Sequence, residues 1–392
     1  MSFLLGHILA AMRYRHLSRI VMVATLCVVI GGASGSLFSQ EEGLQPFPSP
    51  TEAPPGAHYV GAAACAKCHP SETETAPATP MGHALEPVSN CTILRAHPTL
   101  TFREGPYSYE ILRQGDRSIF TVSDGRATIS EPILWAFGLG NAGQTYIFRH
   151  NGSYYESRVS FFSAIEGLDI TVGHLRSVPP SLAAAAGRRI SDDEARQCFG
   201  CHSTDAATTS GLRVEHLIPG VTCESCHGPG AEHVAAMQAG KLENLHIFNP
   251  GKLSPGDLDD FCGSCHRSVI AVQLAGTHGV ADVRFQPYRL SMSKCYDWSD
   301  PRIDCLACHD PHQSKLPDAA TVDQRCLACH PSSRSAQRPA KTSASARGAR
   351  ACPVGKKRCG SCHMPQYEIP GSHTKFTDHD IRVVKPAEPY PG

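Results

Sequence analysis

The sequence lacks an excess of charge of either sign. It contains 36 Lys plus Arg and 36 Asp plus Glu among its 392 residues, so charge gives no reason to expect nucleic acid as a partner. Aromatic residues make up only 7% of the chain, whereas glycine occurs 34 times and proline 30 times. After residue 177 no long amphipathic segment occurs, which leaves little with which to build a core from protein side chains alone.

The N-terminal region lacks an apolar run long enough to span a bilayer. Its apolar run covers residues 20–33, which is shorter than the about 20 residues that a membrane-spanning helix needs. Three arginines precede this run, as in a secretory signal sequence. We therefore expect a signal peptide over residues 1–35 and a Pro-rich linker over 36–57. The features predict a periplasmic protein, or one exported beyond the cytoplasmic membrane, with an uncleaved N-terminal anchor as the alternative.

Residues 98–176 contain no cysteine, and polar and apolar residues alternate there as in β-strands. Asp124-Gly125 and Asn151-Gly152 separate such runs, and these dipeptides tolerate the positive φ angles of tight hairpin turns. We therefore predict a small antiparallel, β-rich insert over residues 98–176. It would serve either as a docking surface for a partner or as a structural cap.

Short helices are predicted just before several cysteine pairs. Residues 191–194 (Ser-Asp-Asp-Glu) and 321–324 (Thr-Val-Asp-Gln) have the capping-box pattern. Ser254 followed by Pro255 offers an N-cap and a proline at the first helical position. A further helix within residues 229–240 is expected to end near Gly240.

Eighteen cysteines and 21 histidines are the strongest anomaly of the composition. Fourteen of these cysteines fall in seven Cys-x-x-Cys-His motifs. This spacing lets two thiols form thioethers with the two vinyl groups of one haem, while the adjacent histidine reaches the iron as its proximal ligand. The seven motifs are Cys65/Cys68/His69, Cys198/Cys201/His202, Cys223/Cys226/His227, Cys262/Cys265/His266, Cys305/Cys308/His309, Cys326/Cys329/His330 and Cys359/Cys362/His363.

Two other uses of paired cysteines explain the motifs less well. Zinc ribbons also contain Cys-x-x-Cys pairs, but they do not require a histidine directly after every pair. Disulfides or redox-active thiol pairs leave the same histidines unexplained. The motifs therefore predict seven covalently attached haem c groups, each with an iron.

The remaining histidines decide whether each iron has a second protein ligand. Twelve histidines outside the motifs would stay in the chain after removal of the signal peptide, which is enough for seven irons. His312 lies three residues beyond His309, at most about 10 Å of extended chain, which is too short to pass round a macrocycle. His312, if it is a ligand, must therefore bind a neighbouring haem. The same reasoning applies less tightly to His233, six residues after His227.

Three stretches carry a resemblance to a known family. They are Cys-x-x-Cys-His-Gly-Pro-Gly-x-x-His at 223–233, Cys-x-x-Cys-His-Asp-Pro-His at 305–312, and Cys-x-x-Cys-His-Met-Pro at 359–365 with a later His-x-x-Phe-Thr-Asp-His. Together they resemble the multihaem c-type cytochrome superfamily, which includes the tetrahaem electron acceptor of hydroxylamine oxidoreductase and related exported cytochromes. The resemblance covers residues 58–97 and 190–385. It implies histidine on both faces of most haems, with distal ligands His233, His312, His373 and His379.

The other distal ligands are less clearly marked. We select His83, His97 and His246 as further candidates, and Met81 beside His83 is an alternative thioether ligand. Three cysteines lie outside both the signal peptide and the motifs, and an oxidising compartment would permit a disulfide between Cys295 and Cys352.

Six motifs lie between residues 198 and 363, so macrocycles rather than packed apolar side chains should form the interior there. We therefore predict a mainly α fold with extensive irregular structure, a multihaem cytochrome c architecture with short helices around stacked haems and a small antiparallel β insert. Its domains are a first haem segment (58–97), the haem-free insert (98–176) and a six-haem cytochrome domain (177–392).

The predicted function is electron transfer between redox partner proteins by an exported heptahaem cytochrome with mostly bis-His haems. All seven motifs end in histidine, which departs from related enzymes and leaves no catalytic residue assigned. One alternative is an oxidoreductase that acts on a small nitrogen or sulfur compound at one five-coordinate haem. The other is a subunit of a membrane-associated respiratory complex.

Overall fold

The computed structural model describes residues 47–300, 302–314, 318–330, 352, 355–385 and 387–391. The predicted signal peptide (1–35) and the first part of the predicted linker (36–46) lie outside the described residues. Ser49–Gly392 is one compact unit. Within the described part of the chain, no helix has both the length and the apolar character needed to cross a membrane.

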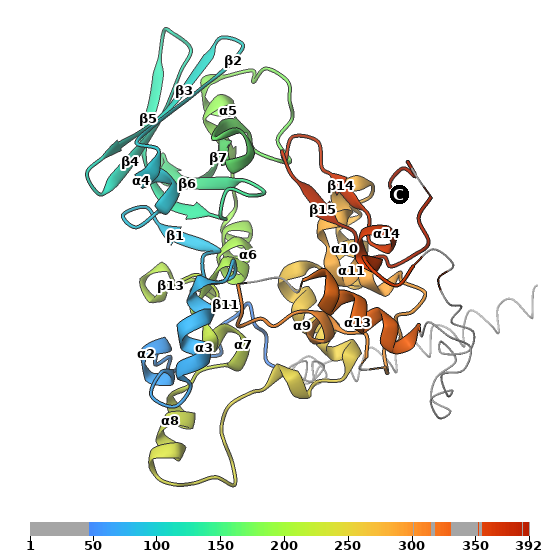
Figure 1. Cartoon of the computed structure of the whole chain (residues 1–392). Coiled ribbons are helices and arrows are strands. Elements are labelled where there is room, and N and C mark those ends of the chain that lie inside the picture. The colour runs from blue at the N-terminus through green and yellow to red at the C-terminus, as the bar shows by residue number, and fades with distance from the viewer. Residues whose placement is uncertain are drawn as a thin grey trace, which may run out of the picture. The chain divides into compact units, whose positions relative to one another are not determined.

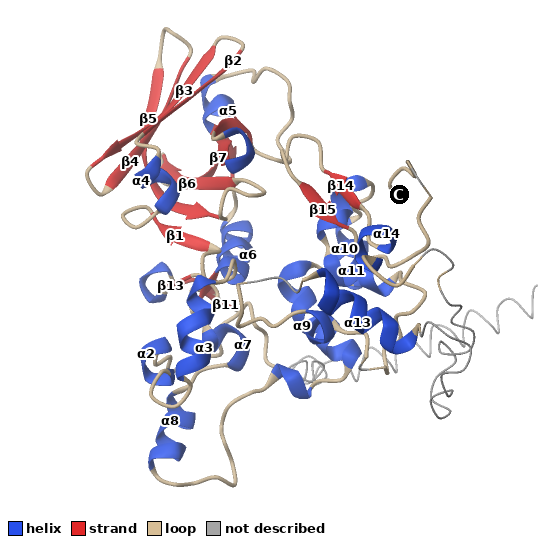
Figure 2. Cartoon of the chain, viewed as in Figure 1, coloured by secondary structure: helices blue, strands red, loops and turns tan. Residues whose placement is uncertain are grey.

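The prediction of a mainly α fold is wrong. Of the described residues 33% are helical and 23% lie in strands (Figure 2). The α-helices are short, with between four and twelve residues, because several of them are little more than the turn that carries one motif. Strands β5 and β7, in contrast, contain ten residues each.

The largest element is a nine-stranded antiparallel sheet (Figure 1). Strands β2 to β8 follow one another along the sheet, β1 pairs with β5 and β9 pairs with β7, so segments on both sides of the predicted insert contribute to it. Strand β2 also packs against β8 at the other end of the path, which curls the sheet toward closure. The strands are β1 (Leu85–Pro87), β2 (Thr99–Glu104), β3 (Tyr107–Gln114), β4 (Arg117–Ser123), β5 (Thr128–Phe137), β6 (Gln144–His150), β7 (Ser153–Phe162), β8 (Gly167–Ile170) and β9 (Gly187–Arg189).

Both predicted hairpins are present, but only the second has a two-residue turn; the first has a four-residue connection over residues 124–127. Ser123 pairs with Thr128 across the first turn, where the Asp124 carboxylate accepts hydrogen bonds from the backbone of Arg126 and Ala127. His150 pairs with Ser153 across the second, and Asn151 and Gly152 both have positive φ there, as a two-residue hairpin turn requires.

The sheet has its own protein core. Alternate residues of β3 and β4 point inward, and they pack with side chains of β6, β7, α4 (Thr92–Ala96) and α5 (Leu182–Ala186). A buried ion pair lies beside this core: Arg158 donates to both oxygens of Glu104, at 2.6 and 2.7 Å, and to the carbonyls of Leu175 and Ser177. The Nε and Nη2 groups of Arg158 thus both have hydrogen-bond acceptors. Because the buried charge is paired and hydrogen-bonded, it is tolerated inside the sheet.

A second cluster of buried side chains joins the sheet to helix α6 (Asp192–His202). Phe199 of α6 is fully buried and makes edge-to-face contacts with Trp135 and Phe137 of β5. Helix α6 ends in the second Cys-x-x-Cys-His motif. The sheet therefore fixes the position of that motif directly.

Two of the predicted helix starts are confirmed and one is wrong. Ser191 forms the capping box of α6 with Glu194, and Ser254 caps α9 (Pro255–His266) with Pro255 in the first turn. Helix α13 (Ala319–Cys329) begins earlier than predicted, because the Asp318 side chain accepts the backbone N–H of Thr321 at 2.8 Å. The expected helix over 229–240 is α8 (Ala231–Gln238), and Gly240 follows it with φ of 69°.

The remaining elements of the described chain surround the motifs. The helices are α2 (Ala62–Cys65), α3 (Pro70–Thr75), α7 (Cys223–His227), α10 (Val269–Ala275), α11 (Gln286–Ser291), α12 (Cys305–Cys308) and α14 (Cys359–His363), with short 3-10 turns at Ala76–Ala78, Ser163–Ile165, Val214–His216, Pro250–Lys252 and Val280–Arg284. Three two-stranded sheets pair β10 (Ser203–Thr204) with β13 (Ile218–Pro219), β11 (Ala207–Thr208) with β12 (Gly211–Leu212), and β14 (Gln366–Glu368) with β15 (Lys375–Thr377).

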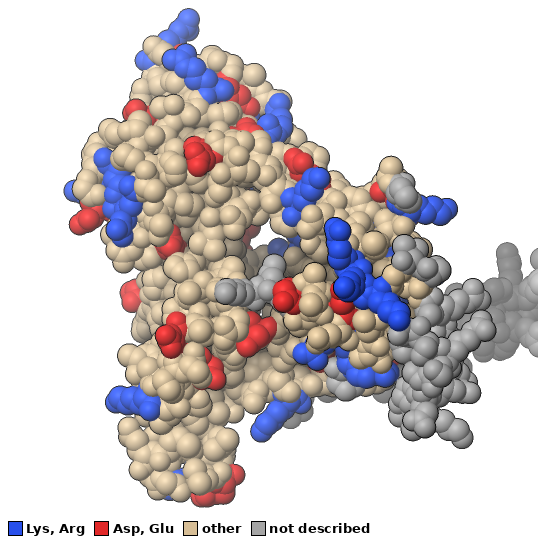
Figure 3. All heavy atoms as spheres, in the orientation of Figure 1, with Lys and Arg blue, Asp and Glu red and all other residues tan. Residues whose placement is uncertain are grey.

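Among the described residues, buried apolar side chains are sparse beyond α6. Leu258, Phe261, Val272, Val283 and Leu290 account for most of them. On the face shown in Figure 3, basic and acidic side chains are interspersed, in keeping with the balanced charge of the sequence.

One buried carboxyl group in α9 lacks a hydrogen-bond partner. Asp259 is 1% exposed, and neither of its oxygens has a partner among the described residues. Burial, reinforced by the nearby Asp260 carboxylate, raises the pKa of Asp259 to about 7. The neutral acid is therefore favoured in the folded protein at mildly acidic pH.

The buried ion pair of the sheet gives a first prediction. Replacing Glu104 with Gln leaves the Arg158 charge buried without its counter-ion, which should lower the free energy of unfolding of the sheet by about 3–5 kcal/mol. Chemical denaturation followed by circular dichroism measures this. The control is Glu110→Gln, at an exposed position of β3, which should change stability little. Equal effects of the two changes would contradict the role of the pair.

Asp259 gives a prediction about pH. Its folded-state pKa of about 7 lies above the value of about 3.9 of an unfolded aspartate. The contribution of Asp259 to the stability of the folded protein should therefore fall as pH rises from about 4 to 7, because only the unfolded chain releases the proton easily in that window. Asp259→Asn should be nearly neutral at pH 4 and stabilising at pH 8 in thermal melts; a stability difference that is the same at both pH values would refute this.

Candidate haem-binding site

One large cavity collects the predicted attachment residues. Its volume is about 5020 Å³, several times that of an ordinary small-molecule pocket of about 300–1,000 Å³. Every cysteine and histidine of the seven motifs lines it, except Cys198. The motifs are spread over almost 300 residues of sequence, and the fold brings them to one continuous space.

Each motif occupies about one helical turn. The third and seventh motifs are the helices α7 and α14 themselves, and the second, fourth and sixth form the C-terminal ends of α6, α9 and α13. In a helix, residues three positions apart lie on the same face, so both cysteines of a motif point the same way. The histidine that follows lies next to them, which is the arrangement that attachment of one haem requires.

Cysteines of different motifs lie close enough for their thiols to interact. The thiol of Cys65 interacts with that of Cys223, so the first and third motifs are neighbours. Three further contacts join different motifs: Cys201 with Cys265, Cys262 with Cys305, and Cys326 with Cys359. Burial is the main cause that raises the pKa of the Cys226 thiol to about 12, so it stays protonated at neutral pH.

Five histidines at the cavity share one orientation. In each, Nδ1 lies within hydrogen-bonding distance of a backbone carbonyl oxygen, which can only accept a hydrogen bond. Nδ1 therefore carries the hydrogen and Nε2 keeps its lone pair, as in a histidine that binds a metal. These pairs are His202 with Ala84 (3.0 Å), His227 with Phe248 (2.9 Å), His233 with Leu245 (2.7 Å), His363 with Arg382 (2.8 Å) and His379 with Thr377 (3.0 Å).

Two pairs of imidazole rings face each other across the cavity. His227 of the third motif and His312 have ring centroids 6.1 Å apart and an interplanar angle of 7°. His309 of the fifth motif and His379 have centroids 6.3 Å apart at 30°. In both pairs the histidine of one motif lies opposite a histidine that follows a different motif. His312 follows the fifth motif and His379 follows the seventh.

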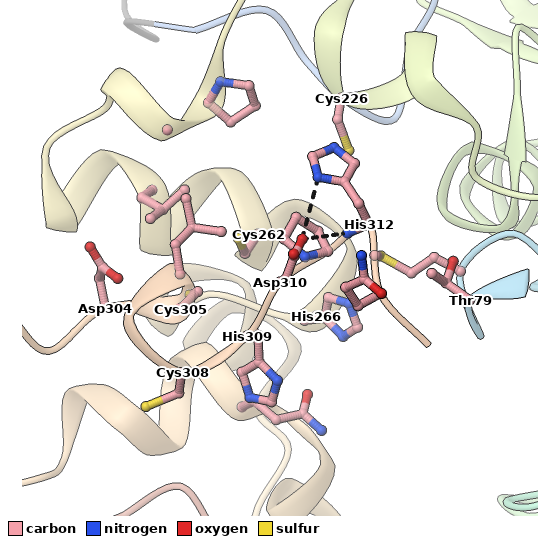
Figure 4. Close-up of a pocket in the computed structure, with 18 of the residues that line it drawn as sticks. Thr79, Cys226, Cys262, His266, Asp304, Cys305, Cys308, His309, Asp310 and His312 are labelled. Carbon is pink, nitrogen blue, oxygen red and sulfur yellow. Dashed lines mark hydrogen bonds and ion pairs between the residues drawn. The ribbon is translucent and has the colours of Figure 1, made fainter. Parts of the chain in front are cut away.

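A short turn places His312 in its pair. The Asp310 carboxylate accepts the backbone N–H of His312 at 3.0 Å and lies 3.3 Å from its Nδ1 (Figure 4). His309, only three residues earlier, points elsewhere in the cavity and pairs with His379. The two histidines of this stretch therefore face different partners.

The structure places four predicted distal histidines away from the cavity lining. His83 is 42% exposed with Nδ1 3.0 Å from Glu86, and His97 packs on the ring of Phe161. His246 lies 3.3 Å from Glu232. The Nε2 atom of His373, the usual ligand atom, is 2.7 Å from the Asp169 carboxylate of β8. Of the predicted distal set, the cavity lining contains His233, His312 and His379, and Met81 also lines it.

The other cysteines have separate environments. Cys91 is fully buried in the sheet core and its thiol donates to Gln144 at 3.2 Å. Cys295 lies at the cavity near Cys326 and Cys329 and forms no disulfide in the described structure, so the suggested Cys295–Cys352 bond is not present there.

Two buried carboxylates accept hydrogen bonds from the backbone of the motif segments, and the spacing of the motifs gave no indication of them. Glu224, between the cysteines of the third motif, and Asp323, three residues before the sixth, both accept hydrogen bonds from the start of another motif segment. The only sequence signal is an acidic residue within a segment that must be buried. Such a signal is too common to single them out.

The residues at the cavity fit haem c as the cofactor. Paired thiols on one helical face, an adjacent histidine with Nε2 available and a large lined space are the three features that covalent attachment requires. The cysteines of the motifs would hold the vinyl side of each macrocycle, and the motif histidines would hold its iron.

Comparisons with known proteins agree with this fit. The family described as cytochrome c554 and c-prime matches residues 179–228, which contain the second and third motifs. The family described as a doubled CXXCH motif matches residues 302–345, which contain the fifth and sixth. No curated protein matches the chain.

One solved structure, titled as the outer cell wall cytochrome OcwA, is similar over 84% of this chain and 80% of that chain. The sequence identity is 15% and the TM-score 0.46, which is too low to carry a conclusion. The two family matches lie on motifs that the fold gathers around one cavity, and together they support a multihaem c-type cytochrome.

Proposed function

We propose that this chain is an exported heptahaem cytochrome that carries electrons between redox partner proteins. The observation that carries the proposal is the single cavity onto which all seven motifs open. Interactions between cysteines of different motifs support close spacing of the attached haems. Closely spaced redox centres that share one enclosure suit electron transfer through the protein.

The facing imidazole rings support bis-His ligation of two irons. Two nitrogens on opposite sides of one metal lie about 4 Å apart, because each metal–imidazole bond is about 2.0 Å. The ring centroids then lie about 6 Å apart, close to the 6.1 Å of His227 with His312 and the 6.3 Å of His309 with His379. In this proposal His312 serves the haem of the third motif and His379 that of the fifth.

The chain's own side chains would orient the ligands and keep water out. Bound haem iron supplies a one-electron couple, and a second histidine closes its open coordination position. Hydrogen bonds from Nδ1 to backbone carbonyls hold the rings of His227 and His379 in place. Such fixed ligands favour electron transfer because little has to move when the charge of the iron changes.

One observation favours a second candidate function. Of the histidines outside the motifs, the cavity lining of the described structure contains three, fewer than the seven motifs. An iron without a second histidine would be open to a small ligand. This supports the alternative of an oxidoreductase that acts on a small nitrogen or sulfur compound.

The proposed location is the periplasm or beyond, as the N-terminal sequence predicts. Its partners would be a redox donor and a redox acceptor, and a fixed place in a membrane-associated respiratory complex is the alternative. Cell fractionation tests the proposed location. Co-purification with a membrane complex would favour the alternative over a mobile carrier.

The number of haems is tested by intact mass spectrometry. The mature protein should carry the mass of seven covalent haems. Cys223→Ala combined with Cys226→Ala should carry six, because neither vinyl group of that haem has a thiol to bind. The matched control, Cys91→Ala, removes a cysteine of the sheet core and should keep seven; a wild-type protein with fewer than seven haems would refute the heptahaem proposal.

The ligand pairs are tested by spectroscopy of the oxidised protein. His312→Ala and His379→Ala should each convert one low-spin iron to high spin, which EPR and absorption spectra detect. His278→Ala changes an exposed histidine outside the cavity lining and should leave the spectra unchanged. A wild-type protein that already has a high-spin haem which binds nitrite or hydroxylamine would favour the enzyme over the carrier.

A further inference from the structure

Two buried carboxylates connect motifs that are far apart in the sequence. Glu224 of α7 is 3% exposed, and Asp323 of α13 is 7% exposed. Among the residues that the structure describes, neither has a cationic side chain as its hydrogen-bond partner; both accept backbone N–H groups instead. We call these two residues the carboxylate clamps.

Glu224 holds the first motif against the third. One of its oxygens accepts the N–H of Val60 at 2.9 Å and that of Gly230 at 2.8 Å, and the other accepts the N–H of Gly61 at 2.8 Å. Gly61 is the N-cap residue of α2, which leads into the first motif, and its φ of 75° suits glycine. Gly230 precedes α8, which carries His233. One carboxylate thus fixes two motif segments and a distal-ligand helix.

Asp323 does the same for the sixth and seventh motifs. Its oxygens accept the N–H of Arg358 and that of Cys359, both at 2.7 Å. Arg358 is the N-cap residue of α14, the helix of the seventh motif, and its own φ is 61°. A side chain from the preceding motif's helix therefore provides the cap that α14 itself lacks.

The clamps occur at two places where cysteines of different motifs interact. Cys65 meets Cys223 beside the first clamp, and Cys326 meets Cys359 beside the second. Ordinary helix caps, such as Asp318 of α13, act on their own helix. A cap supplied by another motif instead fixes the distance and orientation between two attachment helices. Hydrogen bonds to a charged acceptor are also stronger than those to a neutral one.

We propose that Glu224 and Asp323 are positioning residues that set the electronic coupling within two haem pairs, first with third and sixth with seventh. The inference rests on the proposed function, since it assumes that these motifs carry haems that exchange electrons. Neither residue needs to touch a haem. Each acts by holding the helix that carries the partner's thioether bonds.

The experiment measures the magnetic interaction between ferric haems by EPR in the haem-loaded protein, with Glu224→Ala and Asp323→Ala compared in parallel. The signals of each pair are assigned with variants that lack one haem, Cys65→Ala with Cys68→Ala and Cys359→Ala with Cys362→Ala. Glu224→Ala should abolish the interaction of the first and third haems and keep that of the sixth and seventh, and Asp323→Ala should do the reverse. Each variant is thus the control for the other.

Three further measurements separate positioning from general stability. Amide hydrogen exchange at Val60 and Gly61 should accelerate in the Glu224 variant but not in the Asp323 variant. Glu224→Gln, which keeps one acceptor oxygen, should give an intermediate loss and serves if the alanine variant does not mature. Glu232→Gln, an exposed acid on α8, should change nothing.

Loss of both interactions in either variant would overturn the proposal, because that indicates general loosening. Unchanged coupling despite faster exchange at Val60 and Gly61 would overturn it as well. Failure of the proposed function has a different signature: haems missing from the wild-type mass, or an open high-spin iron in the unmodified protein.

Discussion

The constraint on which the rest of the structure depends is that each Cys-x-x-Cys-His motif must present two thiols and an imidazole from one helical turn. A single turn is too short to be stable by itself, so each needs help from elsewhere. Helices α6 and α9 obtain it from serine caps, whereas α2 and α14 obtain it from carboxylates of other motifs. The elements that stabilise one turn thereby position its neighbour.

The apolar interior of the protein has two parts, a core of packed side chains and a cavity lined by the motifs. Residues from Leu85 to Phe199 supply most of the fully buried side chains, and they form a core of ordinary protein packing. Beyond that, the motif segments surround a space that side chains leave open, and short elements suffice because macrocycles, not leucines, would fill it. Phe199 and its contacts with β5 connect the two parts.

Local rules predicted local features well. Ser191, Ser254 and the two hairpin turns follow from side-chain and backbone preferences that act within a few residues. Thr321 failed as a cap because Asp318, three residues earlier, competes for its N–H. The mainly α prediction failed because the helices that carry the motifs are short, while the insert alone supplies seven of the nine strands of the sheet. The positions of His373 and His312 depend on contacts with distant segments, Asp169 of β8 and His227 of α7, which no spacing rule contains.

The docking of α6 on the sheet has a consequence for how the polypeptide matures. The sheet's interior is complete in amino-acid side chains, so its folding does not have to wait for a prosthetic group. Because Ala195 and Phe199 belong to the cluster that includes Leu85 and Phe137, the second motif is already anchored when the sheet forms. That motif is then a fixed template beside which the later segments, incomplete until their thioether bonds are made, can assemble in order of synthesis.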